Sequence, residues 1–230
     1  MAPSPVLRLL CVHGYRQNEK TFRERTGSLR KVLKKRAELL YVSPPLKVPP
    51  LEAAAQLPAA AGEGNQAGET EENAHGWWFS NPGEDSFNAL DHVETCKGLE
   101  ESLETISKAM VELGPFDGIM GFSQGAALVA MICALKQQGD SRFQFDFAIL
   151  VAGFRSRCTL HNHYYQEPIT LPSLHVFGHT DQVIPGEMSQ ELSTSFVDPV
   201  VLTHPGGHFV PASAPQKPVY LEFLERFQKK

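Results

Sequence analysis

Short apolar runs alternate with amphipathic segments along most of the chain, and this alternation decides the class of fold. Strand-length apolar runs lie at residues 6–12, 37–45, 116–122, 143–154, 172–181 and 198–209. Helical patterns lie at residues 21–36, 96–115, 123–139, 186–196 and 215–230. Nearly continuous apolar strands are covered on both faces, and strand–helix alternation builds parallel sheets. The sequence therefore predicts an α/β fold with a mostly parallel, doubly wound sheet flanked by helices.

One segment interrupts the alternation. The chain has 230 residues, enough for one sizeable α/β domain and short for two, so we expect a single domain over residues 1–230. Residues 46–76 are rich in Ala, Gly, Pro and acidic residues and have no hydrophobic period, which predicts a mobile surface insertion. The alternative is a lid near a functional site.

Three aromatic residues, Trp77, Trp78 and Phe79, follow this insertion directly. They either anchor the insertion to the core or form a wall of an apolar substrate pocket. The residues alone leave both interpretations open.

Charge and composition exclude several classes of partner. The formal net charge is −5 and no dense basic cluster occurs, which argues against nucleic acid. No apolar run approaches the ~20 residues of a membrane helix, so we expect no stable membrane insertion. The N-terminal apolar run has the length of a strand, and we interpret it as the first strand rather than a signal peptide.

The cysteines do not show the spacing of a metal site. They lie far apart without a C-x-x-C pair, so we expect free, mostly buried thiols and no zinc site. These residues are Cys11, Cys96, Cys133 and Cys158.

Residues 118–130, GIMGFSQGAALVA, place a serine between two glycines where an apolar strand meets a helix of small residues. Gly121, Ser123 and Gly125 match the G-x-S-x-G pattern of a nucleophile elbow, a turn so tight that larger side chains would collide with backbone at the glycine positions. The turn sets the serine at a helix N-terminus, where free N–H groups favour a developing anion. The alternative, that Ser123 is only a helix cap, explains less of this context.

A serine hydroxyl needs a base beside it to become a nucleophile. In α/β-hydrolases the acid follows the serine in the chain and the histidine follows the acid. Asp181, in FGHTDQVIP, and His208, in HPGGHFVP, both follow predicted strands, so they are expected at the same sheet edge as Ser123. His208 would take the serine proton, and Asp181 would orient the imidazole. Strand position or chain order disfavours the other candidates, His179, His204 and Asp198.

An oxyanion hole requires at least two donors. The backbone N–H of Gln124, the residue after the serine, is the first candidate. The second is expected in the loop after the first strand, VHGYRQN. We assign it to the Tyr15 N–H, with the Arg16 N–H as the alternative.

The assembled residues resemble the FSH group, a family of serine hydrolases within the α/β-hydrolase superfamily. The matching stretches are HGYRQNEKTFRERTGSLRK, GWWFS, GPFDGIMGFSQGAAL, LPSLHVFGHTDQVIP and THPGGHF. The resemblance implies an α/β-hydrolase fold and a carboxylic ester hydrolase that needs no cofactor, with nucleophile, acid and base at Ser123, Asp181 and His208. It further implies a small-molecule ester with an apolar, longer acyl or alkyl chain, and a cytoplasmic or also nuclear location.

Two other functions remain open from the residues. An acyl-thioesterase, including one acting on acylated proteins, would use the same triad. A non-catalytic binding module on this fold would not need all three triad residues. A metal-dependent hydrolase is disfavoured because the histidines lack H-E-x-x-H spacing.

Overall fold

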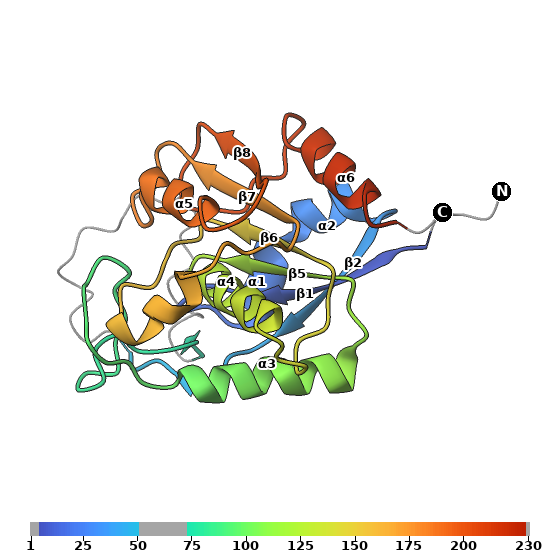
Figure 1. Cartoon of the computed structure of the whole chain (residues 1–230). Helices are drawn as coiled ribbons and strands as arrows, with labels where there is room; N and C mark the ends of the chain where they lie inside the picture. The colour runs from blue at the N-terminus through green and yellow to red at the C-terminus, as the bar shows by residue number, and fades with distance from the viewer. Residues whose placement is uncertain (1–4, 51–72, 229–230) are drawn as a thin grey trace.

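A single parallel sheet organises the computed structural model, which describes residues 5–50 and 73–228. Its six strands lie in the order β2-β1-β5-β6-β7-β8, and every neighbouring pair is parallel (Figure 1). The strands are β1 (Leu7–Val12), β2 (Ala37–Val42), β5 (Gly118–Phe122), β6 (Phe147–Val151), β7 (Ser173–Gly178) and β8 (Val200–His204). The predicted doubly wound sheet is confirmed. The strand order reverses beside β1, and such a reversal is where parallel α/β sheets bind ligands.

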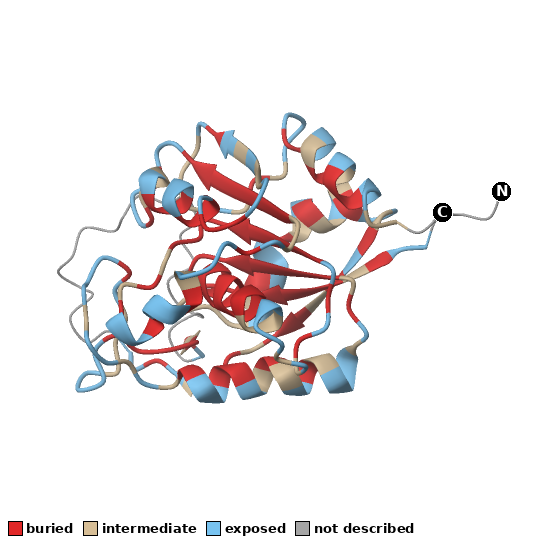
Figure 2. Cartoon of the chain, in the orientation of Figure 1, coloured by how far each residue is buried: buried red, intermediate tan, exposed pale blue. Residues whose placement is uncertain are grey.

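Two hydrophobic cores cover the two faces of the sheet. Successive strand residues point to opposite faces, so Ile119 packs in one core and Met120 in the other. Helices α3 (Leu99–Leu113), α4 (Gln124–Gln137) and α5 (Gly186–Ser193) belong to the core of Ile119. The central strands are buried throughout, whereas the outer helices expose one side (Figure 2).

The opposite face is covered by α1 (Glu19–Arg25), α2 (Gly27–Leu33) and α6 (Lys217–Glu225). The single helix predicted over residues 21–36 is wrong, because Thr26 separates α1 from α2. Thr26 leaves helical geometry at φ −99° and ψ 15°, and its buried hydroxyl donates to the Phe22 carbonyl at 2.8 Å. In the described ranges, every helix is too short or too polar to cross a membrane.

The ends of the predicted insertion form a short two-stranded sheet. Strand β3 (Leu46–Lys47) pairs antiparallel with β4 (His75–Gly76). Val48 and Ala74 are buried against Phe79 in a small separate cluster. These contacts fix the points where the segment leaves and rejoins the domain, while residues 51–72 lie outside the described residues.

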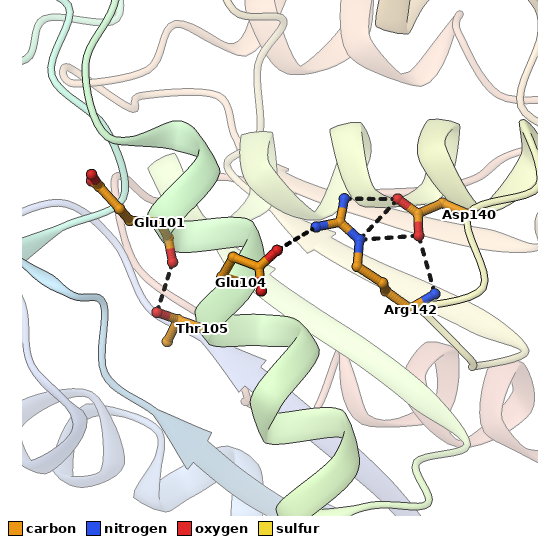
Figure 3. Close-up of polar contacts among 5 residues, drawn as sticks. All are labelled: Glu101, Glu104, Thr105, Asp140 and Arg142. Carbon is orange, nitrogen blue, oxygen red and sulfur yellow. Dashed lines mark hydrogen bonds and ion pairs between the residues drawn. The ribbon is translucent and has the colours of Figure 1, made fainter.

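Arg142 fastens the loop after α4 to the long helix α3. Its guanidinium donates to Glu104 on α3 at 3.0 Å and to Asp140 at 2.8 Å (Figure 3). The hydrogen bonds and charge of Arg142 lower the pKa of the Asp140 carboxyl. Because this cluster lies at the surface, its ion pairs add little to stability.

Candidate active site

Ser123 stands in a strained conformation at the end of β5. Its φ of 57° and ψ of −119° lie outside the regions that L-residues prefer. The Ser123 N–H donates to the Val151 carbonyl at the end of β6 at 2.9 Å, and α4 begins at the next residue. Strain of this kind persists only where surrounding structure enforces it, and it gathers at functional sites.

The two glycines of the elbow are required by backbone contacts. A Cβ at Gly121 would lie 2.5 Å from the Gly125 carbonyl oxygen. A Cβ at Gly125 would lie 2.2 Å from the Val12 carbonyl oxygen. Both separations are below any real Cβ contact, so the strand-to-helix turn and its approach to β1 depend on glycine at these positions.

Asp181 and His208 meet at the same edge of the sheet. His208 Nδ1 lies 2.8 Å from Asp181 Oδ2, and the aspartate side chain is fully buried. The other carboxylate oxygen, Oδ1, accepts the backbone N–H groups of Val183 at 2.8 Å and Ile184 at 2.9 Å. With both oxygens of Asp181 engaged, Nδ1–H of His208 is the donor, which leaves Nε2 as the imidazole nitrogen available to a serine.

Ser123 and His208 line one cavity of about 260 Å³. The His208 ring packs against Phe122, with ring centroids 4.7 Å apart. Ser123 is 8% exposed. The structure therefore brings the predicted nucleophile and base to one cavity, with the predicted acid behind the base.

The loop after β1 forms the facing wall of the cavity. Both expected oxyanion-hole residues of this loop, Tyr15 and Arg16, line it. The Arg16 N–H donates to the His75 carbonyl at 2.8 Å and is thereby occupied. Among the described residues, the N–H groups of Tyr15 and Gln124 have no acceptor. This difference favours the pair Tyr15 and Gln124 over the alternative with Arg16.

Except for Arg16, which was considered for its backbone N–H, the polar residues of the cavity wall were not identified from the sequence. Gln17, Thr21 and two arginines, Arg16 and Arg25, line it together with Ser123. Within the described ranges neither arginine forms an ion pair with a carboxylate. These residues lie in the stretch YRQNEKTFRER. Its pattern is typical of an ordinary loop followed by an amphipathic helix, so it did not indicate a cavity wall.

The structure does not bring Trp77, Trp78 and Phe79 to the Ser123 cavity. Their side chains are 0%, 1% and 3% exposed and belong to the hydrophobic clusters of the domain. The Gln124 side chain holds the first two by their backbone, accepting the Trp77 N–H at 2.9 Å and donating to the Trp78 carbonyl at 2.8 Å. These contacts support the anchoring interpretation, and the pocket-wall interpretation stays a prediction.

The disfavoured histidines and aspartate occupy other positions. His204 is buried, its Nδ1 accepts the Gly206 N–H at 3.2 Å, and burial lowers its pKa. His179 and Asp198 are exposed. His13, next to the oxyanion loop, is fully buried, and this burial lowers its pKa to about 4. None of these groups makes the paired contact that His208 makes with Asp181.

Comparison with known proteins bears on the family and the fold. Residues 2–220 match a family described as serine hydrolase (FSH1). Esterase OVCA2 of Xenopus tropicalis is 59% identical over 226 residues, covering 98% of this chain and 95% of that protein. The crystal structure of esterase PE8 superposes with a TM-score of 0.61 at 16% identity, covering 98% of this chain and 95% of that one. The structure of Zea mays acyl-protein thioesterase 2 gives a TM-score of 0.62 at 17% identity, covering 97% and 96%. The predicted α/β-hydrolase fold is confirmed.

Proposed function

Because the chain belongs to the serine hydrolase (FSH1) family, we propose that it hydrolyses carboxylic esters through Ser123, His208 and Asp181. The observation that carries the proposal is the short contact between His208 and the buried Asp181, with His208 and Ser123 on one cavity. This is the arrangement that activates a serine hydroxyl near neutral pH.

The reaction has two halves. In the first, Ser123 Oγ bonds to the acyl carbon while His208 Nε2 takes the hydroxyl proton. His208 then gives that proton to the departing alcohol, and the acyl group stays on the serine. In the second half, water attacks the acyl carbon while His208 takes its proton. The bond between the acyl carbon and Ser123 Oγ then breaks, His208 returns the proton to Oγ, and the carboxylic acid leaves. The Tyr15 and Gln124 N–H groups stabilise the oxyanion that forms in both halves.

The preference for an apolar acyl or alkyl chain stays a prediction. Some residues of the cavity wall favour an apolar chain, and others favour an anionic group. The rings of Tyr15 and Phe122 offer apolar surface, whereas Arg16 and Arg25 bring two cations into the same wall. A series of p-nitrophenyl esters of rising chain length, each with and without a terminal carboxylate, separates these influences. Maximum kcat/KM with long neutral chains supports the apolar prediction, and a maximum with the carboxylate esters contradicts it.

The test of the proposed chemistry compares wild type with Ser123→Ala on these esters. The variant is expected to lose activity by about 10⁴-fold or more, because removing a triad member removes the nucleophilic route. Matched oxygen and sulfur esters decide between an esterase and a thioesterase. A wild-type chain that is folded and inert on both would overturn the proposal in favour of a binding module.

The location and the domain count also stay predictions. The cytoplasmic or nuclear location follows from the family resemblance alone. A single domain over residues 1–230 predicts one cooperative unfolding transition.

A further inference from the structure

We infer that Cys96, Cys158 and His161 form a binding site for a thiophilic divalent cation, Zn²⁺ or a close analogue. None of these residues is among those that line the Ser123 cavity. The site therefore adds a function to the fold that the proposed hydrolysis does not use.

The three ligand atoms already lie close together. The two sulfur atoms and a ring nitrogen of His161 are all within 4.8 Å of one another. Cys96 Sγ and His161 Nε2 are 3.1 Å apart. Ligand bonds of about 2.3 Å to sulfur and 2.0–2.1 Å to nitrogen separate two ligands of a tetrahedral zinc by roughly 3.5–3.8 Å. Shifts of an ångström or less would let the three atoms bind one ion.

A second hydrogen bond orients the histidine toward the sulfur atoms. Ser156 Oγ lies 2.6 Å from His161 Nδ1. The same oxygen accepts the Cys158 N–H at 3.3 Å. Metal-bound histidines characteristically have their other ring nitrogen fixed in this way. Ser156 therefore leaves Nε2 of His161 facing Cys96.

The backbone brings the two ligand-bearing segments together without a metal. Val93 N–H donates to the Arg157 carbonyl at 3.1 Å, and Thr159 N–H donates to the Val93 carbonyl at 2.9 Å. Cys96 stands shortly before α3, and His161 lies in the 3-10 helix η2 (Thr159–Tyr165). The site is thus set by paired backbone rather than by loose loops, which lowers the cost of ordering it on binding.

The cluster of Cys96, Cys158 and His161 is accessible to solvent on the side of Cys96. Cys158 and His161 are each 2% exposed, whereas Cys96 is half-buried. Three protein ligands with an open fourth position form a known zinc arrangement, in which water completes the tetrahedron. On binding, each thiol loses its proton to solvent, and the ion joins the segment before α3 to η2. The His161 ring also meets Trp78 edge to face at 6.0 Å between centroids.

The expectation of no zinc site rested on the spacing of the cysteines. Cys96 and His161 are 65 residues apart in the chain. Cys158 and His161 form a local C-x-x-H pair in the stretch CTLH, but the pairing of Val93 with Cys158 that brings Cys96 to them is formed only on folding.

The test uses the full-length, fully reduced chain titrated with Zn²⁺ against a chromophoric chelator. One ion per chain is expected, and Co²⁺ in its place should give a thiolate-to-metal absorption band. Cys96→Ser and His161→Gln should weaken binding on the order of 100-fold or more, and Ser156→Ala about 10- to 100-fold. Cys133→Ala, which removes a buried thiol in α4, should leave affinity and stoichiometry unchanged.

Thermal unfolding supplies a second measurement if a ligand variant folds poorly. Zn²⁺ should raise the melting temperature of wild type and Cys133→Ala, because a ligand bound only by the folded state stabilises it. Absence of stoichiometric binding by the reduced wild type overturns the inference. So does binding that survives both Cys96→Ser and Cys158→Ser. A chain that ignores Zn²⁺ but forms a Cys96–Cys158 disulfide with oxidised glutathione would instead hold a redox pair.

Discussion

Single residues set the geometry of the candidate site through hydrogen bonds and close contacts with the backbone around them. Ser123 holds a strained φ of 57° because β5, α4 and the Val151 carbonyl enforce it. Asp181 is held by two backbone donors and holds His208 in turn. The positions of these residues were predictable from the sequence. The elbow pattern reflects a tight strand-to-helix turn, and Asp181 and His208 follow strands that end at the same edge of the sheet.

Replacing Gly125 tests the elbow at this scale. Gly125→Ala places a methyl group 2.2 Å from the Val12 carbonyl oxygen, so β1 and α4 must separate. We expect the free energy of unfolding to fall by about 1–3 kcal/mol, as for overpacked sites, and ester turnover to fall with it. Urea unfolding provides the measurement. Gly27→Ala is the control, because its nearest neighbour would be 3.5 Å away; an equal loss in both variants would contradict the account.

Replacing Asp181 tests the orientation of the base. Asp181→Asn keeps the size of the side chain but removes the negative charge that, in the proposed mechanism, stabilises the His208 imidazolium. We expect kcat to fall by about 10⁴-fold while the far-UV spectrum stays unchanged. Asp198→Asn alters the exposed aspartate that was the rival acid and should leave kcat within about twofold. The assignment fails if Asp198→Asn is the more damaging of the two changes.

At the scale of elements, sequence patterns found the strands and helices of the sheet but missed contacts between distant segments. The apolar runs predicted every strand of the parallel sheet. For the central strands the reason is burial on both faces, which requires such runs. The break at Thr26 was missed because a buried hydroxyl bonded to Tyr41 ends α1, and that partner lies on β2. The polar cavity wall and the cysteine–histidine cluster were missed for the same reason, since they exist only after folding.

The Gln124 side chain joins the start of α4 to the segment that carries Trp77 and Trp78. Removing this side chain tests the link. Gln124→Ala leaves the Trp77 N–H and the Trp78 carbonyl buried without partners. Each unpaired group costs about 1–3 kcal/mol, so we expect the free energy of unfolding, measured by chemical denaturation, to fall by roughly 2–6 kcal/mol in total. Gln144→Ala removes an exposed amide that bonds to the Ser141 carbonyl, where water replaces the contact. Similar stabilities for the two variants would show that Gln124 does not anchor the tryptophan segment.

At the scale of the whole molecule, the sheet separates two cores and buries polar groups inside them. His175 on β7 is 2% exposed, bonds to Ser173 Oγ at 2.9 Å and packs against Phe196. Burial lowers the pKa of His175 from 6.5 to about 3. The folded chain therefore keeps this imidazole neutral at a pH where the unfolded chain protonates it.

The stability of the whole chain should respond to pH through this residue. Between pH 6.5 and about 3 the unfolded state binds the additional proton, so stability falls as the pH falls. His175 contributes a slope of up to about 1.4 kcal/mol per pH unit and nothing above its unfolded pKa. His175→Gln should reduce the slope of unfolding free energy against pH, whereas His92→Gln, at an exposed position, should not. Parallel slopes in wild type and His175→Gln would refute the assignment.

The most direct test of the central claim is to locate the residue that a fluorophosphonate modifies. The folded wild-type chain is treated with the reagent and digested, and the adduct is mapped by peptide mass spectrometry. We predict one adduct, on Ser123, that appears together with loss of ester turnover and is absent from Ser123→Ala. An adduct on another residue that abolishes turnover, or a turning-over enzyme that the reagent never labels, would contradict the assignment of Ser123 as the nucleophile.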